Sequence, residues 1–318
     1  MSVRSLWSVL LTAVAALALG SSVAMAATKP AVTTGGATNV VQQSARIAGT
    51  IDPNGATTTY SFQYGRTTAY GQSTPELTVS GDGPRGVSVD LTGLTPATKY
   101  NYRLVARNSA GQTIGANRTF RTPKAPLGIT IAAAPNPVVF GSGTTIAGQV
   151  TGTGNAGVNV ALQSNPFPYT QGFKQVGNTV VAGGDGSFSF LLPALPMTTQ
   201  YRVVRTGASL ASPIALVGVQ PVVSTRVGTY RVRRNARLTF SGTIRPALPG
   251  TLMALQKKKS DGTWALIAGM VSRTSNSEQS KYKVRVRIPR GGTYRVYAGV
   301  ANGKFVPAVG REVRIRLR

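Results

Sequence analysis

The sequence predicts an all-β chain in which three tandem β-sandwich domains follow a signal peptide. After residue 26, apolar and polar residues alternate over runs of about four to eight positions, and Gly, Pro, Asn and Asp separate the runs. This pattern is typical of antiparallel strands joined by turns. No stretch there shows the 3.6-residue apolar period of an amphipathic helix. The 318 − 26 = 292 remaining residues accommodate three sandwiches of about 100 residues each.

Residues 1–26 are expected to form the signal peptide. Arg4 supplies a positive start, Val9–Leu19 is an apolar run, and Ala24-Met25-Ala26 fits a signal peptidase site. This run is too short to span a bilayer, which takes about 20 apolar residues. No second run of membrane length follows, so we expect no transmembrane segment in the mature chain. The protein is therefore expected to be secreted, extracellular or associated with the cell envelope, with an uncleaved N-terminal anchor as the alternative.

Cysteine is absent from the whole chain. An exported protein of this composition is held by neither disulfides nor a lipid-modified cysteine. Small secreted eukaryotic domains often depend on disulfides, so this absence favours a bacterial origin.

Two proline-rich junctions divide the mature chain. They are Thr122–Pro126 and Val219–Pro221, where proline blocks helix continuation and strand pairing and so predicts a short, stiff linker. The predicted domains are residues 27–124, 125–219 and 220–318.

The first block carries the most specific motif. The run Val87–Tyr100 ends in Leu94-Thr95-Pro96 and continues as a strand to Gly111. Together with strand patterns at Ile47–Ile51 and Tyr60–Tyr64, it resembles the E–F corner and F strand of a fibronectin type III domain over residues 30–123. The resemblance implies a tyrosine corner formed by Leu94, Pro96 and Tyr100, with the Tyr100 ring in the core and its hydroxyl bonded to corner backbone. No Arg-Gly-Asp tripeptide occurs, so integrin-type binding does not follow.

The second and third blocks repeat each other. Thr145–Val150 aligns with Thr239–Ile244, and Gly186–Phe190 aligns with Ser280–Val284, both at an offset of 94 positions. A sustained offset predicts a duplicated structural unit. The two blocks resemble the Ig-like repeats of bacterial surface and secreted proteins.

Catalytic chemistry has few side chains available to it. Without histidine or cysteine, imidazole bases, thiol nucleophiles and the metal sites built on either residue are excluded. Of the eight carboxylates, four lie in turn motifs and are expected to cap local backbone, and the other four are scattered. We therefore predict no catalytic residues, no metal and no cofactor, with an undetected enzyme as the remaining alternative. The turn carboxylates are Asp52, Asp82, Asp185 and Asp261.

Positive charge is concentrated in the third block. Residues 219–318 contain 21 basic and 3 acidic side chains, a net charge of 21 − 3 = +18 within the total of +27. In several predicted strands the bases alternate with apolar residues, so they share one strand face. If those strands are neighbours, the outer face of one sheet is a cationic surface. The residues predicted to bind a polyanion are Lys281, Lys283, Arg285, Arg287, Arg295, Arg314, Arg316 and Arg318.

The charge favours a polyanionic partner. Candidates are an anionic cell-wall polymer, an acidic polysaccharide or an anionic lipid surface, whereas no motif accompanies the charge that would read a nucleic-acid sequence. The alternative is a solvated strand face in an arginine-rich composition. These observations predict a non-catalytic secreted or cell-surface structural or adhesion protein.

A second hypothesis is a carbohydrate-associated accessory protein working beside polysaccharide-degrading enzymes. Phe167, Tyr169 and Phe173 would then stack on sugar rings. Trp264 occupies the place of Phe173 in the repeat, which instead favours a shared role in core packing.

Overall fold

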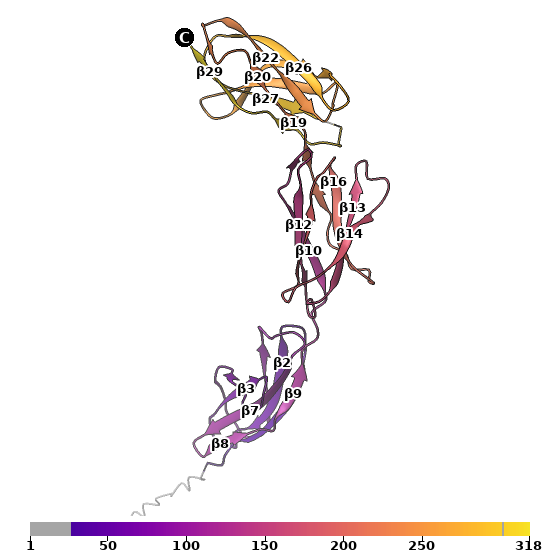
Figure 1. The fold of residues 1–318 in the computed structure, drawn as a ribbon. Coiled ribbons are helices and arrows are strands. Elements are labelled where there is room, and N and C mark those ends of the chain that lie inside the picture. The colour runs from indigo at the N-terminus through magenta and orange to yellow at the C-terminus, as the bar shows by residue number, and fades with distance from the viewer. Residues whose placement is uncertain (1–26, 301) are drawn as a thin grey trace, which may run out of the picture. The chain divides into compact units, whose positions relative to one another are not determined.

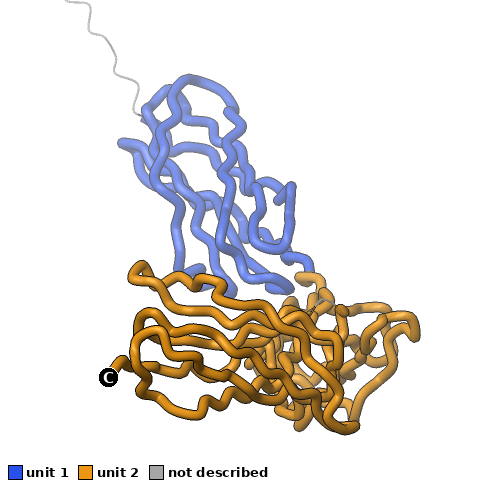
Figure 2. Tube along the Cα trace, turned by 90° about the horizontal axis from the view of Figure 1, so that it is seen from above, with its two compact units in different colours: residues 1–123 blue, residues 124–318 orange. Residues whose placement is uncertain are grey.

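The computed structural model describes residues 27–300 and 302–318, so the expected signal peptide lies outside the described residues. These residues form strands and no helix, which confirms the predicted all-β class. None of the described residues forms a helix long and apolar enough to cross a membrane. They divide into two compact units, residues 27–123 and residues 124–318 (Figure 2).

The first unit is a two-sheet sandwich (Figure 1). Its three-stranded sheet has the order β1-β2-β6, and its second sheet has the order β4-β3-β7-β8, with β5 on β3 and β9 on β7. The strands are β1 (Ala31–Thr38), β2 (Ala45–Asp52), β3 (Thr58–Gly65), β4 (Gln72–Ser73), β5 (Leu77–Val79), β6 (Arg85–Leu91), β7 (Lys99–Asn108), β8 (Gly111–Ile114) and β9 (Arg118–Arg121).

Alternation along β7 builds the core of this unit. Tyr102, Leu104 and Ala106 are buried on one face, whereas Arg103 and Arg107 lie on the other. At the corner before β7, the Tyr100 ring is buried and stacks on Phe120 with ring centroids 5.5 Å apart. The Tyr100 hydroxyl accepts a hydrogen bond from the Thr95 N–H at 2.9 Å, and Leu94 is buried beside the corner.

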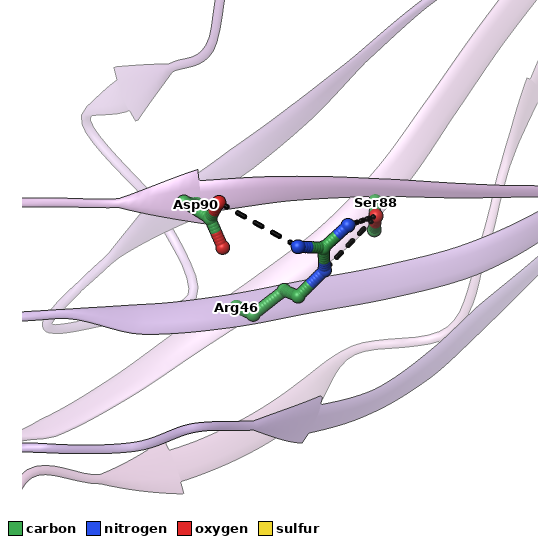
Figure 3. Close-up of polar contacts among 3 residues, drawn as sticks. All are labelled: Arg46, Ser88 and Asp90. Carbon is green, nitrogen blue, oxygen red and sulfur yellow. Dashed lines mark hydrogen bonds and ion pairs between the residues drawn. The ribbon is translucent and has the colours of Figure 1, made fainter.

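An ion pair joins β2 to β6 on the outer face of the smaller sheet. Arg46 and Asp90 are cross-strand partners, and their closest charged atoms, Nη1 and Oδ2, are 3.7 Å apart (Figure 3). Arg46 also donates from Nη2 to the Ser88 hydroxyl at 2.7 Å. Both side chains are largely exposed, so this pair contributes at most about 1 kcal/mol.

The second unit begins with a second sandwich. Its sheets have the orders β10-β12-β15 and β14-β13-β16-β17, and β11 pairs with β18 in parallel. The strands are β10 (Gly128–Ala134), β11 (Val138–Val139), β12 (Thr144–Thr151), β13 (Asn159–Pro166), β14 (Lys174–Val181), β15 (Ser187–Leu192), β16 (Thr199–Arg205), β17 (Ala215–Val217) and β18 (Val219–Gln220).

The third sandwich completes the unit. One sheet has the order β19-β22-β26-β25 with β20 on β22, and the other has the order β21-β29-β27-β23-β24 with β28 on β27. The strands are β19 (Val222–Val223), β20 (Arg226–Val227), β21 (Arg231–Val232), β22 (Ala236–Arg245), β23 (Leu252–Lys258), β24 (Trp264–Val271), β25 (Arg273–Thr274), β26 (Ser280–Ile288), β27 (Gly292–Gly299), β28 (Ala308–Val309) and β29 (Val313–Leu317).

The predicted repeat is confirmed by strand positions. β12 and β15 pair as β22 and β26 do, and β13 and β16 pair as β23 and β27 do. The apolar side chains of both sandwiches belong to one continuous buried cluster. The boundaries of the three domains, residues 27–124, 125–219 and 220–318, remain predictions.

The expected linker at Val219–Pro221 is wrong in one respect. Val219 is fully buried, β18 pairs with β11, and the Val219 carbonyl accepts a hydrogen bond from the Val306 N–H at 2.9 Å. Pro221 lacks an N–H and interrupts pairing only at its own position. The residues on either side are therefore free to pair.

Candidate anion-binding groove

The eight predicted cations lie in two different sheets. Lys281, Lys283, Arg285 and Arg287 are on β26, which pairs with β22 and β25. Arg295 is on β27 and Arg314 and Arg316 are on β29, both in the other sheet, and Arg318 follows β29. The eight predicted cations therefore do not share the outer face of one sheet. Alternation had indicated which residues point outward, but not which strands are neighbours.

Strand β26 presents one column of positive charge. Its exposed positions alternate with Tyr282, Val284, Val286 and Ile288, which are buried or partly buried against the sandwich interior. Residues two apart on a strand are about 7 Å apart along it. Two unit charges at that separation repel by about 0.6 kcal/mol in water. The column is thus a closely spaced row of like charges.

A groove with a volume of about 1120 Å³ lies along β26. Its walls include residues of β20, β22, β24 and β25 in addition to β26 itself. Met270, Val271 and Val284 form its apolar part. No Asp or Glu is among its lining residues. The basic lining residues are Arg226, Arg273, Lys281, Lys283 and Arg285.

Hydroxyl side chains on β22 lie opposite the cations of β26. Thr243 pairs with Lys281, Ser241 with Lys283, and Thr239 with Arg285 in the strand register. Arg226 on β20 pairs with Ser241 from the other side, and Arg273 on β25 pairs with Lys281. Anionic oxygens accept hydrogen bonds from both ammonium or guanidinium groups and hydroxyls. Within the groove lining, Thr243 and Ser241 therefore place neutral donors beside Lys281 and Lys283.

The groove cations have no acidic partner in the described part of the chain. Within residues 27–300 and 302–318, ion pairs occur between Arg46 and Asp90 and between Arg245 and Glu278. Neither pair includes a groove residue.

Tyr282 anchors strand β26, which forms one wall of the groove. Its hydroxyl donates to the Ser224 carbonyl and lies 2.9 Å from the Thr225 hydroxyl, so it ties β26 to the segment between β19 and β20. Burial raises the pKa of Tyr282 to about 12, an effect that the hydrogen bond with Thr225 partly opposes. The hydroxyl consequently stays protonated near neutral pH and remains a donor.

Arg295 is engaged elsewhere. Its Nε donates to the Gln256 Oε1 at 2.8 Å, and its guanidinium carbon lies 4.0 Å from the centroid of the Trp264 ring. Trp264 is half-buried on the outer face rather than in the core, and Phe173 lies under Arg202 in the same way. Trp264 and Phe173 thus share a packing role, as predicted. The prediction that they pack in the core is wrong, because both rings lie half-buried under arginines.

Two groove residues, Arg226 and Arg273, were missed by sequence reasoning. Each lies in a strand of two residues, too short for an alternating pattern to form.

Asp52, Asp185 and Asp261 accept hydrogen bonds from local backbone, as predicted for the turn carboxylates, whereas no such bond is present for Asp82 among the described residues. Asp52 accepts from the N–H groups of Asn54 and Gly83, and Asp185 accepts from the Ser187 N–H. No group of three or more Asp and Glu side chains that could hold a metal ion occurs among the residues the structure describes.

No established protein family matches the chain, and neither does any curated protein. Among solved structures, the sensor domain of the anti-sigma factor RsgI4 from Pseudobacteroides cellulosolvens is 21% identical, with a TM-score of 0.25, and the match covers 30% of this chain and 94% of that chain. A tetra-tandem repeat in the extending region of a large adhesion protein is 15% identical over 90% of this chain and 74% of that chain, with a TM-score of 0.28. The FN1–FN3 domains of chicken CNTN1 are 14% identical over 89% of this chain and 98% of that chain, with a TM-score of 0.30. Similarities at these TM-scores do not assign a function.

Proposed function

We propose that this chain is a non-catalytic secreted or cell-surface adhesion protein whose third sandwich binds an anionic polymer of the cell envelope or matrix. The observation that carries the proposal is the groove along β26, which combines five basic side chains with hydroxyl donors and has no carboxylate in its lining. Its linear row of cations suits a chain with repeated negative charges, such as an anionic cell-wall polymer or an acidic polysaccharide.

The physical basis is electrostatic and reversible. Each anion that enters the groove removes part of the repulsion between neighbouring cations and releases counterions. Exposed charges are screened beyond about 8 Å at physiological salt, so only anions that contact the groove gain the full interaction. Binding should therefore weaken steeply as salt rises.

The test is a matched pair of charge reversals in the full chain. Lys281→Glu, Lys283→Glu and Arg285→Glu reverse three charges of the groove. Arg314→Glu, Arg316→Glu and Arg318→Glu change the net charge by the same amount on β29 and the residue that follows it. With a soluble glycerol-phosphate polymer at about 50 mM salt, the groove variant should bind at least tenfold more weakly. That factor corresponds to about 1.4 kcal/mol. The β29 variant should change affinity less than threefold.

Three results would contradict the proposal. Equal weakening by both variants would mean that net charge, and not the groove, governs binding. Tighter binding to vesicles rich in phosphatidylglycerol than to the polymer would assign the groove to a lipid surface. Salt-insensitive binding to a neutral glycan, lost on Phe167→Ala or Tyr169→Ala, would support the accessory carbohydrate-binding role instead.

A further inference from the structure

One arrangement of three side chains occurs in every sandwich, here named the Arg–Gln–aromatic stack. In each, an arginine donates from Nε to the Oε1 of its cross-strand glutamine partner and lies over an aromatic ring. The three copies are Arg103 with Gln63 at 2.8 Å and the Tyr70 centroid at 4.4 Å, Arg202 with Gln163 at 2.8 Å and the Phe173 centroid at 4.3 Å, and Arg295 with Gln256 at 2.8 Å and the Trp264 centroid at 4.0 Å.

The copy in the first sandwich borders a hollow of about 430 Å³. The hollow lies between β3, β4 and the turn that joins them, and its volume is in the range of small-molecule sites. Its lining is dominated by amide and hydroxyl groups around the one aromatic ring. Its lining residues include Gln63, Thr68, Tyr70, Gln72, Ser73 and Arg103.

Local backbone geometry forms this hollow. Tyr70 has a φ of 60° and Gly71 a φ of 77°, so the turn reverses sharply before β4. Gly65 is required beneath the turn, because a Cβ there would overlap the backbone oxygen of Tyr70. The Tyr70 hydroxyl hydrogen-bonds to the Asn117 Oδ1 at 3.2 Å. The ring is therefore held at its hydroxyl by Asn117 and at its face by Arg103.

Arg103 brings unused donors to the hollow. Its Nε is occupied by Gln63, but neither Nη group forms a hydrogen bond or ion pair with any residue in the ranges 27–300 and 302–318. A guanidinium presents its Nη groups as a planar fork that matches a carboxylate in two parallel hydrogen bonds. Stacking and the bond to Gln63 fix the fork in place, so little side-chain freedom is lost when an anion binds.

We propose that this hollow binds an acidic sugar, such as a uronate residue of a polysaccharide. Its carboxylate would pair with the Nη groups of Arg103, while Thr68, Gln72 and Ser73 supply donors and acceptors for ring hydroxyls. The exposed part of the Tyr70 ring contacts the sugar's C–H groups. A peptide carboxylate would leave these polar groups around the hollow without partners. The site lies in a different unit from the groove and does not depend on it.

The experiment uses the full chain carrying the groove reversal Lys281→Glu, Lys283→Glu and Arg285→Glu, so that groove binding does not interfere. A trimer of galacturonic acid is titrated while the Arg103 side-chain N–H and Tyr70 ring signals are followed by NMR. We expect saturable shifts at both residues and at least tenfold weaker binding of the methyl-esterified trimer. Arg103→Gln should weaken binding at least tenfold.

The repeated stack supplies the matched control. Arg202→Gln breaks the same arrangement in the second sandwich and should leave trimer affinity unchanged. If Arg103→Gln unfolds the first sandwich, Arg103→Lys keeps the charge and removes the fork, and it should also weaken binding. The proposal is overturned by equal loss in Arg202→Gln, by equal binding of the methyl ester, by undiminished binding in Arg103→Lys, by a carboxylate peptide that binds as tightly as the trimer, or by the absence of saturable shifts.

Discussion

Individual carboxylates in this chain serve turn geometry. Asp261 accepts from the backbone N–H of Thr263 at 2.9 Å and from its hydroxyl at 2.6 Å, in the turn between β23 and β24. Asp185 accepts from the Ser187 N–H at 2.9 Å before β15. The sequence predicted this capping role from the Asp-Gly pairs, because the motif is local and needs no knowledge of the fold. With only eight acidic side chains in the chain, this use leaves few to neutralise the basic strands.

Acidification should therefore weaken the Asp261 turn. Hydrogen bonds from the Thr263 side chain and backbone hold the pKa of Asp261 below its ordinary value of 3.8. Since the folded-state pKa is lower than the unfolded one, the stabilisation is present above pH 3.8 and is lost as pH falls through the folded pKa. An NMR titration of the Asp261 carboxyl carbon should give a midpoint below 3.8. Thr263→Val removes one donor and should raise the midpoint, and a wild-type midpoint at or above 3.8 would contradict the assignment.

Strand elements depend on glycine at one repeated position. Gly148 in β12 and Gly242 in β22 each lie opposite an aromatic residue of the next strand, Phe188 or Tyr282. A Cβ at Gly148 would overlap the Thr130 backbone oxygen, and one at Gly242 would overlap the Ser224 backbone oxygen. These glycines let the neighbouring strand and the aromatic ring approach closely, which gives a physical reason for their recurrence in the repeat.

Gly242→Ala should destabilise the third sandwich by about 1–3 kcal/mol, the usual cost of overpacking. The added methyl group would press on the Ser224 carbonyl and on the Tyr282 ring that supports the groove wall. Gly269→Ala in β24 is the control, because a Cβ there has no neighbour within 4 Å and its effect should stay within about 0.5 kcal/mol. Urea unfolding midpoints of the two variants compare these costs. Equal midpoints would show that the packing around Gly242 yields without cost.

Strand identity was predictable at this scale, but strand partnership was not. Alternation around Lys281–Ile288 correctly placed the cations of β26 on the outer face. It could not place β26 in one sheet and β29 in the other, because alternation records only the face of a strand. The hollow beside Tyr70 also could not be predicted from the sequence, since it depends on a turn conformation and on the close approach of the Tyr70 backbone to Gly65. Gln63 and Arg103 are 40 positions apart in the sequence and meet through strand register, whereas the turn after β3 brings Tyr70 to Arg103.

Across the whole molecule, charge is divided unequally between the units. Residues 27–123 carry nine basic and four acidic side chains, or +5, and residues 124–318 carry 25 basic and four acidic side chains, or +21. The sequence showed this asymmetry directly, because net charge needs no structure. Like charges within one compact unit repel one another, and this repulsion opposes the folding of that unit. Anions in solution should therefore stabilise the second unit.

The salt dependence of unfolding should locate this repulsion in the groove. Raising NaCl from about 20 to 200 mM screens neighbouring cations and should raise the unfolding temperature of the third sandwich. Relief of about 1 kcal/mol corresponds to roughly 4–8 °C in a domain of about 100 residues. Trp264 fluorescence in a Trp7→Phe background reports on this sandwich, because the chain has two tryptophans. This rise in unfolding temperature should be largely lost in the triple variant Lys281→Glu, Lys283→Glu, Arg285→Glu, where negative charges replace three cations of β26. It should be kept in the triple variant Arg314→Glu, Arg316→Glu, Arg318→Glu. An equal salt response in both would show that the repulsion is spread over the whole unit and that β26 holds no special share of it.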